Sequence, residues 1–467
     1  MQISQEVFVD RGLIKKYNRA APRYTSYPTA PHFKEELLDS TIYKNELLRL
    51  EKVDPNRPLS IYIHIPFCQD ECYYCGCMRM ITKDRSRAED YLKALYKEVE
   101  LLGALFGREK PVVQLHFGGG TPTYLDGRQL EELMAKIGTQ FNLLTDDSGD
   151  YSIEVDPREA DGGKLALLRR LGFNRISFGV QDINPKVQEA VNRVQPLELD
   201  VQVVAEARKA GFKSVNIDLI YGLPHQTAET FATTLKTVLD DLDPDRLAIF
   251  NFAHLPDLLK NQRKIDAAHL PQPDEKLQIL EESIRILEER GYVYIGMDHF
   301  GKPEDELTVA QRDGKLHRNF QGYTTHSECD LVGLGVSSIS QIGDMYAQNL
   351  KKVHHYQNHM DSGELPLFRG LLMSADDRIR HTVIMKIMCD FRLDFASIEA
   401  KFGLVFEEYF ADALQQLAVM ERDGLLEIEN RIIQVRPAGK ILIRNIATAF
   451  DWYLSQSLTK NSFSQAI

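Results

Sequence analysis

Membrane spans, secretion signals and disulfide scaffolds all leave marks that this sequence of 467 residues lacks. No apolar run approaches the roughly 18 residues that cross a membrane as a helix. Residues 1–12 alternate polar and apolar types and have no apolar core of the kind found in a signal peptide. The six cysteines are too few to stabilise a chain of this length by disulfide cross-links. We therefore expect a cytoplasmic protein with no membrane partner.

Basic charge is scarce as well. The 56 lysines and arginines face 68 aspartates and glutamates, which gives a formal net charge of −12. Non-specific nucleic-acid binding depends on a basic surface, so we expect no nucleic-acid partner. With 43% hydrophobic and 27% charged residues, the composition is that of an ordinary globular protein. At about 150 residues per domain, the length predicts two or three domains.

From residue 60 to residue 297, short β-branched runs alternate with amphipathic helical patterns, which are clear in 227–242 and 274–290. This alternation indicates an α/β fold with a parallel sheet and right-handed crossovers. We expect an incomplete (β/α) TIM-like barrel of about six parallel strands. A doubly wound sheet stays open as the alternative, because strand order cannot be read from one sequence. The expected strands are 60–65, 112–117, 151–155, 174–179, 214–220, 246–251 and 292–296.

A change of pattern after residue 297 divides the chain. Residues 298–345 are rich in glycine, aspartate, threonine and histidine, and we expect a long irregular stretch that extends or covers the functional site. The remaining residues indicate helices, with a hairpin at 424–435. The expected organisation is an N-terminal segment that covers the site (1–50), a barrel with an extension at its site (51–362) and a small, mostly helical C-terminal domain (363–467).

Polar residues and glycines follow nearly every expected strand. In parallel α/β folds the carboxyl ends of the strands build the functional site. These residues therefore predict one shared mouth rather than scattered surface groups. They are His64, Cys68, 118–120, Glu154, Asp156, Gln181, Asp182, Asp218, Asn251 and His254.

Four of the six cysteines crowd into ten residues. Cys68, Cys72 and Cys75 have the spacing Cys-x3-Cys-x2-Cys, and Cys77 follows. Thiolates are soft ligands that suit zinc or iron–sulfur clusters. A structural zinc would need Cys77 or a distant histidine as its fourth ligand. A four-iron, four-sulfur cluster with three cysteine ligands keeps one iron open to a chelating small molecule, and we favour this interpretation.

Seven segments together resemble one enzyme family. They are 22–29 (PRYTSYPT), 63–68 (IHIPFC), 75–77 (CGC), 116–123 (HFGGGTPT), 153–157 (IEVDP), 216–224 (NIDLIYGLP) and 317–325 (HRNFQGYTT). With the cysteine loop after the first strand, they resemble the radical S-adenosylmethionine (SAM) enzymes. Within that superfamily they resemble the oxygen-independent coproporphyrinogen III oxidases, or coproporphyrinogen dehydrogenases, of haem biosynthesis. The resemblance spans nearly the whole chain.

The resemblance implies an oxidoreductase that works without oxygen. Two propionates of coproporphyrinogen III would be oxidatively decarboxylated to vinyl groups, which gives protoporphyrinogen IX. Cys68, Cys72 and Cys75 would hold one 4Fe-4S cluster, which cleaves SAM to a 5′-deoxyadenosyl radical that takes hydrogen from a propionate β-carbon. The cofactor would supply the difficult chemistry and the protein its orientation. The resemblance also implies a flavodoxin- or ferredoxin-like electron donor, and we expect a monomer.

The same resemblance implies further site residues. Cys77 is marked as catalytic without a defined role. Gly119 and Gly120 would let the backbone approach the ligand, which a side chain would block. Tyr74 stands where the family often has phenylalanine, and its ring keeps the stacking surface. SAM would occupy two sites, a first lined by Tyr62, Gly119, Glu154 and Ile339, and a second lined by Tyr74, Gly120, Thr121, Gln181, Arg193, Asp218 and Ala253.

Two expectations concern the substrate and a competing function. Arg23, Arg312 and Arg318 are candidates to pair with the four substrate carboxylates. A related branch of radical SAM proteins resembles a haem chaperone and performs no decarboxylation, and this binding function is the alternative. That branch typically lacks a cysteine at position 77 and a segment like 319–323. This chain has both, so the sequence favours the enzyme.

Overall fold

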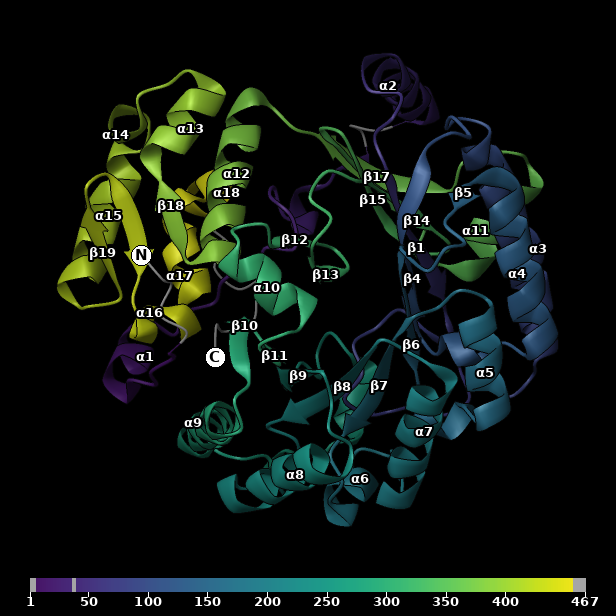
Figure 1. Cartoon of the computed structure of the whole chain (residues 1–467), viewed down its shortest axis with the longest axis horizontal. Helices are drawn as coiled ribbons and strands as arrows, with labels where there is room; N and C mark the ends of the chain where they lie inside the picture. Colours follow the sequence, from purple (N-terminus) through teal and green to yellow (C-terminus); the bar gives the residue numbers. More distant parts are fainter. Residues whose placement is uncertain (1–5, 36–38, 457–467) are drawn as a thin grey trace.

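A sheet of 13 strands runs through the centre of the computed structural model, which describes residues 6–35 and 39–456 (Figure 1). The expected strands up to residue 251 all form, and they lie side by side in chain order. The strands of this sheet are β1 (Leu59–Ile65), β4 (Pro111–Gly119), β5 (Asn142–Leu143), β6 (Asp150–Val155), β7 (Arg175–Gln181), β8 (Ser214–Tyr221), β9 (Arg246–Asn251), β10 (Val293–Gly296), β11 (His299–Gly301), β14 (Asp330–Leu334), β15 (Ile339–Ile342), β16 (Met345–Asn349) and β17 (Leu367–Leu372).

The strand order confirms the predicted α/β fold with a mainly parallel central sheet. The order is β10-β11-β9-β8-β7-β6-β4-β1-β14-β15-β16-β17, with β5 beside β4. Strands β1, β4, β6, β7, β8 and β9 are parallel neighbours. Their order does not reverse, as it would at the switch point of a doubly wound sheet. The carboxyl ends of these strands therefore meet along one rim.

Helices between the parallel strands cover the outer face of the sheet (Figure 1). Helix α8 (Ala228–Asp241) shows why they form where the sequence predicts them. A capping box between Thr227 and Thr230 starts the helix, and Phe231 and Leu235 on one face are fully buried. The other crossover helices are α3 (Ser86–Gly103), α4 (Gly127–Gln140), α5 (Gly162–Arg170), α6 (Pro185–Ala190), α7 (Leu197–Ala210) and α9 (Pro273–Glu289).

The prediction of an irregular stretch at 298–345 is wrong. This stretch holds β11, α10 (Glu306–Arg312), β12 (His317–Asn319), β13 (Gly322–Thr324), β14, β15 and the first residue of β16. Strand β14 is parallel to β1 and every residue in it is buried, so it lacks the alternation that marks a half-exposed strand. The strand expected at 292–296 is also placed differently, because β11 lies between β10 and β9 and is antiparallel to both.

The interior of the barrel is filled in part by the β12–β13 hairpin. The amide of Gln114, on β4, donates to the Thr324 hydroxyl at 3.2 Å, and the amide of Gln321 donates to the Ser60 hydroxyl on β1 at 3.2 Å. Both strand residues lie near the amino ends of their strands. The hairpin therefore closes the half of the lumen at the amino ends of the strands. The rim at their carboxyl ends stays open for the functional site.

Residues 20–34, which we name the N-terminal strap, run between the two edges of the sheet. Arg23 pairs with Asp298, between β10 and β11, at 2.7 Å. Lys34 forms an antiparallel bridge with Gly370 of β17 at the opposite edge. The strap therefore spans the opening that the incomplete barrel leaves.

The C-terminal part packs beside the sheet (Figure 1) and confirms the predicted hairpin as β19–β20. Strand β17 belongs to the main sheet, so the division at residue 363 stays a prediction.

None of the described helices is both long and apolar enough to span a membrane. Residues 1–5, 36–38 and 457–467 of the predicted terminal segments lie outside the described residues. The remaining elements are α1 (Arg11–Tyr17), α2 (Ser40–Val53), α11 (Val353–Asp361), α12 (Ala375–Asp390), β18 (Arg392–Asp394), α13 (Phe395–Phe402), α14 (Phe406–Tyr409), α15 (Ala411–Arg422), β19 (Leu426–Glu429), β20 (Ile432–Val435), α16 (Pro437–Ile441), α17 (Ile443–Ala447) and α18 (Trp452–Gln456).

A buried carboxyl joins α3 to the strands added by the 298–345 stretch. Glu98 is fully buried and accepts hydrogen bonds from the Gly335 amide, the Asn349 amide group and the Tyr356 hydroxyl. Burial raises the pKa of Glu98 to about 7 despite these hydrogen bonds. The folded state therefore binds a proton there that the unfolded chain has released above its ordinary pKa of 4.5.

We expect this carboxyl to make the protein less stable as the pH rises from about 5 through 7, by about 3 kcal/mol at most. Glu98→Gln removes the titration while keeping an oxygen acceptor. Thermal unfolding of both proteins between pH 5.5 and 8.5 measures the difference. The wild-type melting temperature should fall relative to the variant over this range. Parallel curves for the two proteins would contradict the assignment.

Candidate functional site

The four clustered cysteines lie on one loop at the carboxyl end of β1. We name this loop, residues 67–81, the cluster loop. Cys68 ends β2 (Phe67–Cys68), which pairs with β3 (Met80–Ile81), so the two short strands close the base of the loop. The Thr82 amide donates to the Cys68 carbonyl at 3.0 Å. The loop therefore leaves and rejoins the rim at almost the same place, with its thiols between.

One side chain of the loop itself and one from far along the chain hold the backbone of this loop. Arg79 donates to the carbonyls of Cys75 and Cys77 at 3.0 and 3.2 Å. The Asn261 amide donates to the carbonyls of Tyr73 and Cys75, both at 2.9 Å. Such contacts pre-organise a ligand loop, because its carbonyls are satisfied before any metal binds. No sequence pattern points to Asn261, which lies more than 180 residues from the loop.

The thiol spacing separates a cluster from a single metal ion. Thiolates 2.3 Å from one zinc lie about 3.8 Å apart. Within the described residues, just one trio of potential ligands converges to within 4.8 Å, and it is His326, Glu328 and Cys329. The cysteines at 68, 72 and 75 are therefore spread wider than one zinc allows. This spread and the all-thiol donor set suit a cluster of several irons.

Polar groups surround the sulfur atoms. The Thr121 hydroxyl donates to the Cys68 sulfur at 3.4 Å, and Arg193 donates to the Cys72 sulfur at 3.6 Å. A hydrogen bond from Cys77, together with the charge of Arg79, lowers the pKa of the Cys75 thiol. The contacts at Cys75 favour the thiolate form that binds metal, whereas burial raises the pKa of the Cys68 thiol to about 11 against the hydrogen bond from Thr121. Cys77 therefore contacts the Cys75 thiol, a predicted ligand. The sequence alone did not indicate this contact.

Arg193 joins this loop to the ends of β6 and β7. Its guanidinium donates to Asp156 at 2.8 Å and to the Gly179 carbonyl at 2.6 Å. Burial opposes ionisation of Asp156, but Arg193 and Arg158 outweigh it and lower the pKa of Asp156 to about 2. The Nε of Arg193 and the Oε1 of Gln181 are buried and have no hydrogen-bond partner among the described residues. Buried polar atoms are rarely left so, and these two can serve a polar ligand.

Two carboxyls on neighbouring strands differ in protonation. Glu154 accepts hydrogen bonds from His116 at 3.2 Å and from the Gly119 amide at 3.3 Å. Burial opposes ionisation of Glu154, but these contacts outweigh it and lower its pKa. Burial, reinforced by the charge of Glu154, raises the pKa of Asp218 to about 7. Near neutral pH the rim therefore offers one ionised carboxylate and one carboxyl that keeps a proton about half the time.

These groups line one cavity of about 330 Å³ at the rim. A cavity of this size fits a small molecule. The residues predicted for the site that line it are Cys68, Cys72, Tyr74, Cys75, Cys77, Gly119, Gly120, Thr121, Glu154, Gln181, Arg193 and Asp218.

Comparison with known proteins identifies the family. Residues 62–238 match the radical SAM superfamily, and residues 373–442 match the HemN C-terminal domain. The chain is 50% identical over 458 residues to the oxygen-independent coproporphyrinogen III oxidase of Pseudomonas aeruginosa, with 98% of each chain covered. It is 48% identical over 459 residues to that of Synechocystis, with 97% of each covered. The solved structure of coproporphyrinogen III oxidase (HemN) from Escherichia coli, titled a radical SAM enzyme, superposes with a TM-score of 0.91 at 48% identity, covering 96% of this chain and 100% of that chain.

This chain belongs to the family of oxygen-independent coproporphyrinogen III oxidases. It is a radical SAM enzyme, and membership implies a 4Fe-4S cluster and SAM as cofactors. The three loop cysteines fit the cluster by donor type and spacing. The unpartnered atoms of Arg193 and Gln181 fit a polar ligand beside it. The role of each lining residue and the second SAM site stay predictions.

Three of the predicted cofactor residues lie outside the lining of this cavity. Tyr62 lies just below it, where its ring stacks on His116 with 5.8 Å between centroids. Ala253 lines the neighbouring cavity described below. Ile339 packs against an apolar cluster that includes Phe33 of the strap.

Other predicted members of the shared mouth have different surroundings. Asp182 is buried and accepts hydrogen bonds from Gln226 and Thr234, so it holds the chain together behind the rim. Asn251 and His254 line the neighbouring cavity. His64 is nearly buried between the Tyr62 hydroxyl and the Met78 carbonyl, as expected for a packed histidine.

Contacts within the protein also require glycine at the two rim positions, and the predicted approach of a ligand to them stays a prediction. A Cβ on Gly119, whose φ is +116°, would lie 2.8 Å from the His64 ring. A Cβ on Gly120 would lie 2.7 Å from the Phe67 carbonyl oxygen and 3.0 Å from the Cys68 sulfur. Protein atoms therefore occupy the space beside both glycines: the His64 ring of β1 lies beside Gly119, and the start of the cluster loop packs beside Gly120.

We expect the three ligand cysteines to differ from their neighbours in iron binding. After anaerobic reconstitution, Cys68→Ala, Cys72→Ala and Cys75→Ala should each lose nearly all of the about four irons of a 4Fe-4S cluster. Cys77→Ala should keep the iron and its visible absorbance. Cys389→Ala is the matched control, because Cys389 is buried far from the loop. Retained iron in Cys72→Ala would contradict the ligand set.

The glycine packing gives a second expectation. Gly120→Ala should lower the iron content strongly, because its Cβ meets backbone at 2.7 Å. Gly76→Ala, on the cluster loop itself, meets just the Leu259 side chain at 3.4 Å and should load normally. Iron assay after reconstitution of both variants tests this. Equal iron in the two variants would show that the packing at Gly120 does not set the loop.

Proposed function

We propose that this enzyme converts coproporphyrinogen III to protoporphyrinogen IX by oxidative decarboxylation of two propionates, with the residues of the rim cavity in the roles assigned below. The observation that carries the proposal is a loop whose three cysteines, in Cys-x3-Cys-x2-Cys spacing, line the rim cavity, in a chain that is 50% identical over nearly its full length to oxidases of this name. Each propionate loses carbon dioxide, one hydrogen atom and one electron, and a vinyl group remains.

The cluster and SAM, when bound, supply the one-electron chemistry that removes the hydrogen atom. The chain's own residues orient the cofactors. The ionised carboxylate of Glu154, fixed by His116, accepts hydrogen bonds from an ammonium or a ribose hydroxyl. Arg193 and Gln181 offer a donor and an acceptor that no protein group uses. Asp218 in its protonated form can donate a hydrogen bond from the same rim.

Water and oxygen must be kept from a radical, and the fold offers a cover. The N-terminal strap spans the sheet opening, and the β12–β13 hairpin fills the lumen below the rim. Both surround the space without closing the rim cavity itself. Exclusion of solvent is what a protein contributes to cofactor chemistry of this kind.

We further propose the cellular setting that such chemistry requires. The enzyme works as a monomer in the cytoplasm, where a small flavodoxin- or ferredoxin-like protein delivers electrons to the cluster loop. The exposed position of Cys77 on this loop supports an approach from solvent at that point. Nucleic acid is no partner, in keeping with the formal charge of −12.

The direct test is an anaerobic assay of the reconstituted enzyme with a reductant, SAM and coproporphyrinogen III. Wild type should release two carbon dioxide molecules per protoporphyrinogen IX, and Cys72→Ala should release none because it lacks a cluster ligand. Cys389→Ala controls for the loss of a cysteine elsewhere and should keep the activity.

The haem chaperone is the competing function, and the same preparation distinguishes it. A wild-type protein with a full cluster that cleaves SAM, leaves coproporphyrinogen III unchanged and retains haem through gel filtration would contradict the oxidase and favour the chaperone.

A further inference from the structure

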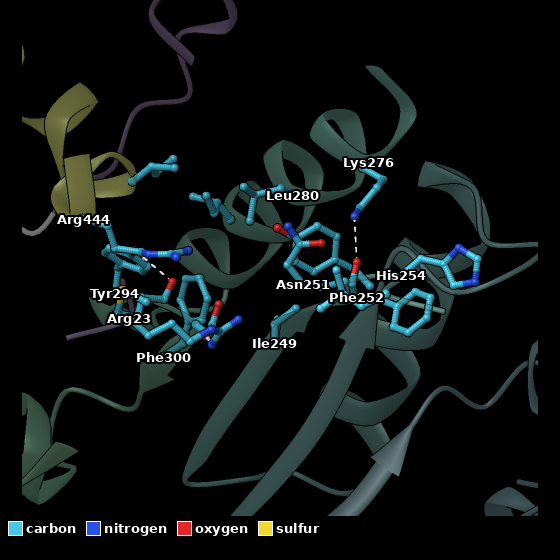
Figure 2. A pocket seen from close by; sticks show the side chains of 17 residues that line it. Arg23, Ile249, Asn251, Phe252, His254, Lys276, Leu280, Tyr294, Phe300 and Arg444 are labelled. Atoms are coloured by element: carbon cyan, nitrogen blue, oxygen red, sulfur yellow. Dashed lines mark hydrogen bonds and ion pairs between the residues drawn. The ribbon is translucent and has the colours of Figure 1, made fainter. Parts of the chain in front are cut away.

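A second cavity, of about 350 Å³, adjoins β9 (Figure 2), where Ile249 lines it while the next residue, Phe250, lines the rim cavity of the cluster loop. Its walls come from β8, β9, α9, the turn after β10, the strap and the C-terminal helices. Gln262 ties its rim to the cluster loop, since its amide donates to the carbonyls of Tyr74 and Ala253 at 3.0 and 3.2 Å. The cavity is therefore separate from the cluster site and directly beside it.

Cations lie at both ends of this cavity. Figure 2 shows Arg23 and Arg444 at one end and Lys276 at the other, with Leu280 and Ile249 between them. Among the lining residues there is a single carboxylate, Asp298. It is engaged by Arg23 at 2.7 Å. The lining therefore carries more positive than negative charge, in a protein that is acidic as a whole.

Lys276 has no ion pair within the described residues. Its ammonium donates to the Phe252 carbonyl at 2.9 Å, and burial lowers its pKa to about 8. Its stem passes Gly222, where a Cβ would lie 2.6 Å from the Lys276 Cε. Gly222 has a φ of +87°, a conformation that favours glycine, so the local backbone leaves room for the lysine. A buried ammonium held by one carbonyl can still take an anionic partner.

Arg318 adds a further cation beside the same turn. It is 4% exposed, and its guanidinium lies 4.6 Å from the centroid of the Tyr323 ring. Its Nε and Nη1 are buried and have no hydrogen-bond partner among the described residues. After burial itself, the charge of Arg318 is the largest cause that lowers the pKa of His299, to about 3. A guanidinium so placed is costly unless an anion reaches it.

The remaining lining is largely apolar and aromatic. Tyr221, Phe252, Tyr294 and Phe300 form much of the wall, and the Oδ1 of Asn251 is buried with no hydrogen-bond partner in the described part of the chain. An apolar cavity with cations at both ends matches a flat ligand that carries carboxylates at its edge. By contrast Arg312, the third candidate from the sequence, is exposed at the end of α10, with its Nε 3.9 Å from Asp313.

We propose that this cavity recognises the carboxylates of the tetrapyrrole substrate that are not decarboxylated. The inference rests on the proposed function for the identity of the ligand. Two of the four carboxylates react and two remain, so the two that remain must be held away from the reacting carbons. Arg23 at one end and Lys276 at the other hold them, and the charge of the buried Arg318, behind the lining, adds to the positive potential beside Arg23.

The test uses the reconstituted holoenzyme without reductant, so that no turnover occurs. The probes are coproporphyrin III, the oxidised macrocycle with the same four carboxylates, and its tetramethyl ester. Fluorescence titration gives the Kd of each. We expect wild type to bind the acid at least tenfold more tightly than the ester, because charge-assisted pairs are lost in the ester.

Arg23→Gln and Lys276→Gln should each weaken binding of the acid about tenfold, without changing binding of the ester. Arg312→Gln is the matched control, since it removes an exposed arginine of the same chain, and should bind as wild type. In the steady-state assay both cavity variants should raise KM with little change in kcat. Cluster absorbance and thermal unfolding establish that each variant is folded.

Lys276→Gln decides the matter if Arg23→Gln does not fold, because Lys276 has no ion pair to break. Unchanged affinity for the acid in this variant would overturn the inference, as would equal binding of acid and ester by wild type. Wild-type enzyme that binds the acid preferentially but does not turn over coproporphyrinogen III would contradict the proposed function and leave this cavity as an anion site.

Discussion

Within the described residues, the two edge strands of the main sheet, β10 and β17, do not pair with each other, and the rest of the structure is arranged around that opening. Unpaired edges leave backbone groups to be covered. The strap bridges them, from Arg23 beside β10 to Lys34 on β17. The β12–β13 hairpin enters the lumen, and the C-terminal helices close the side of the opening.

The elements that fill the opening also carry its charge. Arg23 comes from the strap, Arg318 from the hairpin and Arg444 from α17, which holds the strap through the carbonyls of Ala21 and Pro22. Long stretches of sequence separate these arginines, and they meet near one carboxylate, Asp298. An acidic chain thus builds a local basic surface where a substrate with several carboxylates would enter.

The cluster loop follows a different principle. Its three thiols come from one short stretch, but the loop keeps its shape through Arg79 and Asn261, which satisfy its carbonyls, and through Gly119 and Gly120, which leave it room. In the rim below it, His116 and the Gly119 amide lower the pKa of Glu154 against burial, while burial and the charge of Glu154 raise the pKa of Asp218 to about 7. The candidate ligands therefore come from one short stretch of sequence, while the pKa values of the rim carboxyls depend on side chains from several strands.

The sequence by itself determined the features that rest on neighbours along the chain: the Cys-x3-Cys-x2-Cys loop, the strands and helices up to residue 251, and the hairpin at 424–435. Periodicity and spacing are local signals. It missed β14, because a strand buried on both faces has no alternation. Only the tertiary structure decided that Asp182 is a buried support and that Asn251 and Ala253 face a second cavity. It also decided that Arg23 and Arg318 lie close to Asp298, while Arg312 is exposed elsewhere. Those outcomes depend on which elements pack together across hundreds of residues. A local hydrophobic pattern indicates that a face is buried, but it does not indicate which element packs against that face.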